Sequence, residues 1–251
     1  MTKFMRIASL IFALLVAAAV NPAHAILVLS ADVNIVDGLP GGAGTTTAGN
    51  ATFFQNILGG NNSVLLHGPG FGRTTVLNSY FNSLSGVSSS IGAISAANLS
   101  GADLLVSLLP SSAYSASELA DMNAFLSGGG DIMFVGENSN FASENTRINT
   151  ALAALGSTMS IIPGTLFDAG YQTAVGSQIG SHPLTAGVAS LLYAAPSEII
   201  VAGGTTLFSG TGRQPFVAVE GVFASVPDTG STLTLLSLCL GFLAFARRLR
   251  S

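Results

Sequence analysis

The sequence predicts an α/β fold: a doubly wound, mainly parallel sheet with an antiparallel C-terminal extension, and a hydrophobic helix at each end of the chain. Two patterns in the body and one at the termini support this prediction. Short, continuous apolar runs are typical of parallel strands that are buried on both faces. Amphipathic helical segments alternate with these runs, which indicates βαβ units. Both termini contain an apolar stretch beside basic residues.

The body of the chain, residues 26–224, contains the predicted strands and helices in alternation. Its size allows one sizeable core. The segment 115–130 has the clearest helical pattern, because Ser115 and Glu118 form a capping-box pair and an apolar face follows them. We expect strands at residues 26–32, 63–68, 88–94, 102–110, 131–136 and 159–162, and helices at residues 52–60, 73–86, 115–130 and over the segment that ends at Gly156.

The last third of the body has a different character. Residues 163–224 contain short strand-like segments, with turn residues between them and little helical pattern. We expect these strands to extend the sheet as an antiparallel edge. The segments are SEIIVAG, TTLFSG and QPFVAVEGV.

The N-terminus has the three parts of a secretory signal peptide. Lys3 and Arg6 form a positive region, residues 7–20 are apolar, and Ala23 and Ala25 fit the small-x-small rule for cleavage. We therefore expect signal peptidase to cut after Ala25 and the chain to be exported. The alternative is an uncleaved anchor helix, for which the apolar region is short.

The charge distribution excludes several partners and chemistries. All twelve acidic residues, but only three arginines, lie in residues 26–228, so no basic stripe is available for nucleic acid or anionic lipid. The single cysteine, Cys239, lies in the C-terminal apolar run, so the body has no disulfide or thiol chemistry. No metal-binding spacing is present, and we predict neither a metal nor a cofactor.

Candidate functional residues lie in the loops that follow the predicted strands, where open parallel sheets bind ligands. Glu137 and Ser139 occupy the position of a nucleophile elbow, but the Ser or Cys between glycines is missing. His182 is a candidate general base, although a His-Pro pair is also a rigid loop entry. The glycine-rich segments PGGAG and GPGFG lack phosphate-binding spacing and indicate turns.

Four acidic residues could line one cleft as sugar-binding or hydrolytic carboxylates. The alternative is that they are ordinary solvated loop residues, because the spacing does not show whether they converge. They are Asp32, Asp37, Glu137 and Asp168.

The body resembles the class I glutamine amidotransferase-like superfamily, in particular its trehalose-utilisation-type branch. The resemblance covers residues 26–210 and includes GGGDIMFVGENSNF, LAALG, the stretch around His182 and VAGGTTL. It implies a flavodoxin-like fold. It does not imply amidotransferase activity, because Glu137 stands at the position of the catalytic cysteine and the His-x-Glu pair is absent: Pro183 and Leu184 follow His182.

The C-terminal segment, residues 225–251, contains a turn motif, an apolar run at 233–246 and a basic tail. As a helix the run would span about 21 Å, which is short for a bilayer core of about 30 Å. Pro and Gly in the motif oppose helix and keep the backbone accessible. The motif is Val226, Pro227, Asp228, Thr229, Gly230, Ser231 and Thr232, and the tail contains Arg247, Arg248 and Arg250.

This layout resembles the PEP-CTERM/exosortase sorting domain in its VPDSG variant, with Thr229 where the variant often has Ser. The resemblance implies a Gram-negative bacterium that makes exopolysaccharide, and an inner-membrane exosortase that cleaves near the motif. We expect a cell-surface or matrix protein whose α/β domain binds a ligand, a glycan or a polymer without catalysis. The alternatives are an exported carbohydrate-active hydrolase that uses loop carboxylates and His182, and a permanently anchored single-pass protein.

Overall fold

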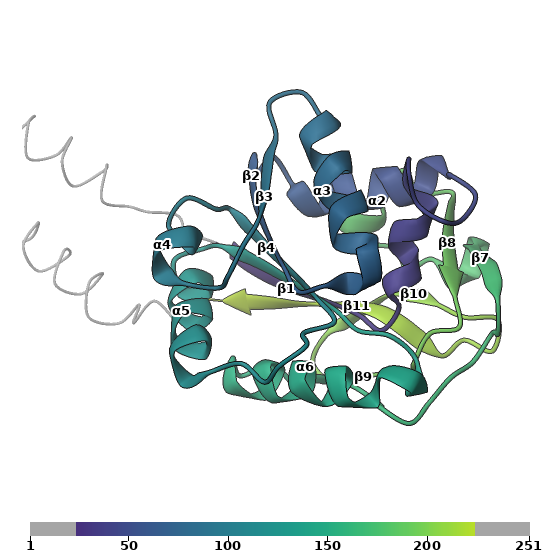
Figure 1. The fold of residues 1–251 in the computed structure, drawn as a ribbon. Helices are drawn as coiled ribbons and strands as arrows, with labels where there is room; N and C mark the ends of the chain where they lie inside the picture. Colours follow the sequence, from purple (N-terminus) through teal and green to yellow (C-terminus); the bar gives the residue numbers. More distant parts are fainter. Residues whose placement is uncertain (1–23, 224–251) are drawn as a thin grey trace, which may run out of the picture. The chain divides into compact units, whose positions relative to one another are not determined.

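A computed structural model describes residues 24–223, and its main feature is a seven-stranded mixed sheet (Figure 1). The strands lie side by side in the order β10-β11-β1-β5-β4-β2-β3. Five of them run parallel, and β10 and β11 pair antiparallel. The strands are β1 His24–Ser30, β2 Ser63–His67, β3 Ser88–Ile91, β4 Leu104–Leu108, β5 Asp131–Val135, β10 Thr205–Ser209 and β11 Pro215–Phe223.

The mainly parallel sheet and its antiparallel extension confirm the predicted α/β class. The strand order differs from the prediction. Flavodoxin-like sheets have the order 2-1-3-4-5, whereas here β1 lies beyond β5, next to β11. The position beside β1 is filled by the C-terminal β10–β11 hairpin, which comes from the other end of the chain. Local apolar patterns identify strands but do not encode which strands become neighbours.

Helices cover both faces of the sheet (Figure 1). On one face α2 (Ala48–Leu58) and α3 (Arg73–Ser83) pack over alternate strand residues such as Val28 and Met133. On the other face α4 (Ala96–Leu99), α5 (Ala116–Ser127) and α6 (Ala142–Ala154) pack over the intervening residues, such as Leu27 and Ile132. Because successive strand side chains point to opposite faces, each buried strand supplies both cores.

The ends of the helices follow the capping residues. Ser115 and Glu118 form the predicted capping box at the start of α5. α2 begins four residues before the predicted start, because the side chain of Thr47 accepts a hydrogen bond from the backbone N–H of Asn50. Asn50 is fully buried, and its side-chain amide bonds the backbone of Ile35 and Leu192, which ties α2 to two other segments.

The last third of the body is only partly as predicted. TTLFSG and QPFVAVEGV form β10 and β11 of the main sheet. SEIIVAG was expected beside them and instead contributes β9 (Ile199–Val201), which pairs antiparallel with β6 (Met159–Ile161) in a separate small sheet. A further antiparallel pair of β7 (Tyr171–Val175) and β8 (Ser190–Ala194) was not predicted, because β7 has no apolar run and three of its five residues are exposed.

Short 3₁₀ turns connect several of these elements. They are η1 Val33–Gly38, η2 Gly70–Gly72, η3 Ser139–Phe141, η4 Gly176–Gln178 and η5 Pro183–Thr185. The first three follow β1, β2 and β5, at the carboxyl ends of the parallel strands. Loops at this end of the sheet therefore combine residues from three distant parts of the sequence.

The described chain begins and ends at the same end of the sheet. β1 and β11 are hydrogen-bonded neighbours, and the N–H of Ala31 after β1 donates to the carbonyl of Phe216 near the start of β11, at 2.8 Å. The two strands therefore run in opposite directions, as the arrow of β11 in Figure 1 shows. Residue 24 and residue 223 lie at the amino end of the parallel strands.

Several predicted features lie outside the described residues. They include the signal peptide up to Ala23, the sorting motif, the apolar run 233–246 and the basic tail. Between residues 24 and 223, no helix has both the length and the apolar character to cross a membrane.

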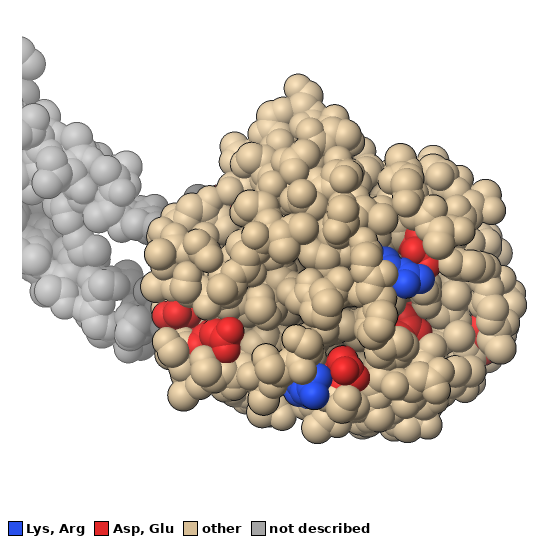
Figure 2. Space-filling view, viewed as in Figure 1, with Lys and Arg blue, Asp and Glu red and all other residues tan. Residues whose placement is uncertain are grey.

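The surface is poor in charge, as the composition predicts. The face in Figure 2 is mostly uncharged, and its basic side chains lie next to acidic ones. Two ion pairs are found among residues 24–223: Arg73 with Asp37 at 2.8 Å and Arg147 with Glu144 at 3.3 Å. This face has no broad basic patch of the kind that nucleic-acid binding requires.

Candidate functional site

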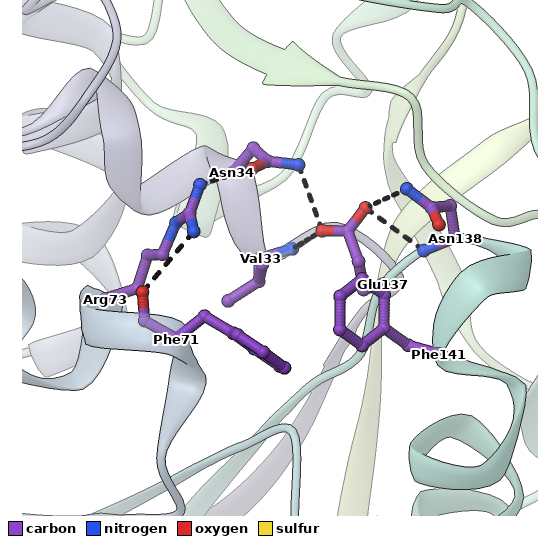
Figure 3. A pocket seen from close by; sticks show the side chains of 7 residues that line it. All are labelled: Val33, Asn34, Phe71, Arg73, Glu137, Asn138 and Phe141. Atoms are coloured by element: carbon purple, nitrogen blue, oxygen red, sulfur yellow. Dashed lines mark hydrogen bonds between the residues drawn. The ribbon is translucent and has the colours of Figure 1, made fainter.

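The candidate site lies where the chain turns in opposite directions after two neighbouring strands. β1 and β5 are adjacent and parallel, but the chain leaves β1 toward α2 on one face and β5 toward α6 on the other. Open α/β sheets bind ligands at such a switch point. A cavity of about 200 Å³ lies here (Figure 3). It is lined by Val33, Asn34, Phe71, Arg73, Glu137, Asn138 and Phe141.

Glu137 forms the floor of this pocket and is buried. One carboxylate oxygen accepts the N–H of Val33 and the side-chain amide of Asn34, both at 3.0 Å. The other accepts the N–H and the side-chain amide of Asn138, at 3.1 and 2.7 Å. A carboxylate offers about four acceptor positions. The protein therefore occupies all the acceptor positions of Glu137 with its own N–H groups.

Asp32 is a second buried carboxylate beside Glu137. It follows β1 and accepts the N–H of Asn34 and the N–H of Ala194 in β8, both at 2.8 Å. The first bond caps η1 and so fixes the turn that presents Val33 and Asn34 to Glu137. Asp32 therefore stabilises the η1 turn next to the pocket and is not one of the residues that line the pocket.

Burial raises the pKa of both carboxyls. Burial, together with the nearby Asp32 carboxylate, raises the pKa of Glu137 to about 9, against the opposing effect of its N–H donors. Burial also raises the pKa of Asp32 to about 7. Because the groups interact, they titrate as a pair. The pKa values of both groups therefore lie above those of the same carboxyls in water.

Arg73 forms one wall and is held by a buried acid. Its Nε and Nη2 atoms donate to the two carboxylate oxygens of Asp37, at 3.1 and 2.8 Å. Asp37 also accepts the hydroxyl of Tyr171 at 2.7 Å. Nη2 donates in addition to the side-chain oxygen of Asn34 at 2.9 Å. The bidentate pair fixes the guanidinium plane, and Asn34 links it to Glu137.

Two phenyl rings form the rim. Phe71 and Phe141 meet edge to face, with ring centroids 5.0 Å apart. Phe71 is 61% exposed, which is unusual for a large apolar side chain. Its backbone has a φ of 48°, in the left-handed region that Phe rarely adopts, and Gly70 and Gly72 on either side also have positive φ. The backbone conformation of the GPGFG loop thus holds the Phe71 ring at the rim of the pocket.

The backbone at Glu137 is fixed by a buried asparagine. The side chain of Asn145 in α6 accepts the N–H of Glu137 at 3.0 Å and donates to its carbonyl oxygen. Gly136 precedes it, and a side chain there would come within 2.4 Å of Ile161 and 2.5 Å of Asn145. The close approach of α6 therefore requires glycine before Glu137.

Replacing Asn145 with alanine is expected to lower the free energy of unfolding by about 2–4 kcal/mol, because it leaves a buried N–H and a buried carbonyl without partners. Urea unfolding measures this loss. The matched control is Asn149→Ala, one turn later in α6, whose side chain bonds the backbone of Ile161 in the same way in a partly exposed place. A smaller loss is expected there because water can replace the side chain; equal losses would contradict this account.

The structure brings some of the predicted residues together and separates others. Asp32, Asp37 and Glu137 converge on one network. Asp168 lies in another, where it accepts the hydroxyl of Tyr193 and bonds Thr211.

The remaining two candidates donate no hydrogen bond to the carboxylates of Asp32 and Glu137. His182 caps its own turn, and its Nδ1 accepts the N–H of Leu184 at 3.1 Å. Ser139 begins η3, next to the pocket, but is not one of the residues that line it. None of the four hydrogen bonds to the Glu137 carboxylate comes from either residue.

Sequence reasoning missed the other six residues that line the pocket: Val33, Asn34, Phe71, Arg73, Asn138 and Phe141. Their positions directly after the predicted strands were the available signal, because those loops meet at one edge of the sheet. Within residues 24–223, no group of three His, Cys, Asp or Glu side chains is arranged to hold a metal ion.

A family model for the VPDSG-CTERM motif matches residues 225–250. The motif marks the chain as an exported surface protein and implies processing by exosortase-type machinery.

No curated protein matches the chain. Among solved structures it is similar to one described as "mmIFT52 N-terminal domain", with a TM-score of 0.49 and 16% identity, over 61% of this chain and 83% of that chain. A likeness of this size supports no conclusion about function. The resemblance of the body to amidotransferase-like domains stays a prediction.

Proposed function

We propose that this protein is exported, is processed at its C-terminus by an exosortase, and at the cell surface or in the matrix binds one sugar unit of a polysaccharide in the switch-point pocket. The sorting motif at residues 225–250 supports the destination. The pocket supports binding: it joins two phenyl rings at the rim to a guanidinium and amides below them.

The chemistry of the pocket favours a sugar ring. Phenyl faces suit the apolar C–H faces of a sugar, and Arg73 and Asn138 offer polar groups for its hydroxyls (Figure 3). A volume of about 200 Å³ is below the roughly 300–1,000 Å³ of drug-sized pockets. One ring of a polymer fits this size better than a dinucleotide or a peptide segment.

Binding without turnover is the proposal because Glu137 is fully engaged. A general acid or base must exchange a proton with the substrate within about 3 Å or through one water. The oxygens of Glu137 already accept four protein N–H groups, and the Nδ1 atom of His182 accepts the N–H of Leu184 in its own turn. These contacts support a positioning role for Glu137 over the alternative of an exported hydrolase.

A binding experiment tests the pocket. Exopolysaccharide isolated from the producing cells is titrated with the exported protein, and Phe71→Ala is expected to weaken binding about tenfold or more, since a buried Phe side chain contributes about 1.5–3 kcal/mol. The control is Ile91→Ala on the edge strand β3, which is 52% exposed and lies outside the pocket. Equal binding by both variants, or release of reducing ends by the wild type, would overturn the proposal.

The destination is tested separately by the intact mass of protein from the same cells. A product that ends near residues 228–230 supports exosortase processing. A product that still ends at Ser251 supports the permanent anchor instead.

A further inference from the structure

The first strand begins at a carboxylate that forms no ion pair with any residue between 24 and 223. The backbone nitrogen of Ile26 donates to one oxygen of Asp131 at 2.9 Å, and the side-chain amide of Asn61 donates to the other, also at 2.9 Å. Asp131 is partly buried at the start of β5. Neither of the two ion pairs found among residues 24–223 includes it. A carboxylate in such a place is stabilised by an adjacent positive charge.

Signal peptidase would place a positive charge at this atom. Cleavage after Ala25 adds water across the Ala25–Ile26 peptide bond: the hydroxyl goes to the Ala25 carbonyl carbon, and the Ile26 nitrogen takes the hydrogen and a further proton. We propose that Ile26 is the mature amino terminus and that its ammonium group pairs with Asp131. The same cut removes His24 and the buried Ala25, so β1 then begins at the charged pair.

The geometry for this pair is already present. The nitrogen that becomes the ammonium is within hydrogen-bonding distance of Asp131, so pairing requires no movement of β1. The same end of the sheet carries a second acid, Asp103, which accepts the N–H groups of Asn62 and Ser63. Asp131 is therefore the carboxylate that contacts the Ile26 nitrogen, whereas Asp103 is engaged by other backbone groups. The acid on neighbouring β11, Glu220, is engaged by Ser157 and Thr158.

Burial supports the same conclusion. It raises the pKa of Asp131 above the ordinary value for Asp, with a further contribution from Asp103. An ammonium beside Asp131 opposes this shift, and Asp131 in turn raises the pKa of the ammonium above the roughly 7.7–8.0 of a free α-amino group. Each partner thus favours the charged form of the other.

The composition makes the amino terminus a unique chemical probe. The only lysine in the chain is Lys3, which leaves with the signal peptide. After cleavage the α-amino group is the only primary amine in the protein. An amine-selective acetylating ester therefore labels one site, and its rate depends on the fraction of that amine that is unprotonated and accessible.

The exported protein is purified from its cells, its amino terminus is identified by mass spectrometry, and labelling is followed at pH 7.5. We expect Ile26 at the terminus and labelling at least about tenfold slower in the folded protein than in concentrated urea. Asp131→Asn should speed labelling of the folded protein about tenfold, since one pKa unit is a tenfold change in free amine. The matched control, Asp103→Asn, should stay within about twofold of the wild type.

Three results would overturn the proposal: a terminus other than Ile26, equal rates for folded and urea-unfolded wild type, or an Asp131→Asn rate no faster than that of Asp103→Asn. If Asp131→Asn fails to fold, the comparison of folded and unfolded wild type still decides, because it needs no variant. The Phe71→Ala binding experiment is independent of all three results.

Discussion

Replacing Arg73 with alanine is expected to lower the free energy of unfolding by about 3–5 kcal/mol, the loss typical of removing one partner of a buried ion pair. Asp37 is 1% exposed and would keep only the hydroxyl of Tyr171 and a long contact to the N–H of Ala43. The uncompensated charge, more than the lost attraction, causes the destabilisation. Urea unfolding at neutral pH measures it.

The chain contains a matched control for this variant. Arg147 pairs with Glu144 three residues earlier on α6, at 3.3 Å and with both side chains partly exposed. Arg147→Ala is expected to cost about 1–2 kcal/mol, because it removes this partly exposed pair and a hydrogen bond to the carbonyl of Pro110 at 2.8 Å. Combining Arg73→Ala with Asp37→Asn should recover part of the loss, because it removes the buried charge. Equal losses for the two arginine variants would contradict a buried Asp37.

The second large effect is a fall in stability as pH rises. Asp32 and Glu137 have pKa values of about 7 and about 9 in the folded protein, well above those of unfolded Asp and Glu. The folded state therefore binds more protons than the unfolded state between about pH 4 and pH 9. Stability from these groups is complete below the unfolded pKa and is lost as pH rises through the folded one.

Each proton bound in excess by the folded state changes the free energy of unfolding by about 1.4 kcal/mol per pH unit. Urea midpoints at pH 6.5, 8 and 9 should therefore decrease in order. Glu137→Gln should flatten this slope, whereas Glu144→Gln, which removes a partly exposed carboxylate on α6, should leave it unchanged. A wild-type midpoint that rises over this range would show that the pair is ionised in the folded protein.

Sequence reasoning found the elements of this fold because their signals are local. The capping box at Ser115 and Glu118 and the apolar runs of the parallel strands depend on residues a few positions apart. The strand order and the β6–β9 and β7–β8 pairs depend on contacts between distant segments. No periodicity in one segment encodes which other segment it will meet.

The same distinction applies to the site. Glu137, Asp32 and Asp37 were candidates because they are acids at the ends of predicted strands. That Glu137 is saturated by donors could not be predicted, since Val33 and Asn34 are 104 and 103 residues away in sequence. Phe71 was missed because its glycine-rich loop indicates only a turn. The exposure of its ring and its contact with Phe141 are properties of the folded chain.

The antiparallel course of β1 and β11 matters for a protein that we expect to be cleaved near both termini. Both points of attachment, residues 24 and 223, lie at one end of the strands, whereas the pocket is built by loops at the other. Cutting the chain before Ile26 or after Phe223 changes no strand connection or loop that shapes the pocket. The export and sorting machineries can thus trim the chain at both attachment points and leave the pocket intact.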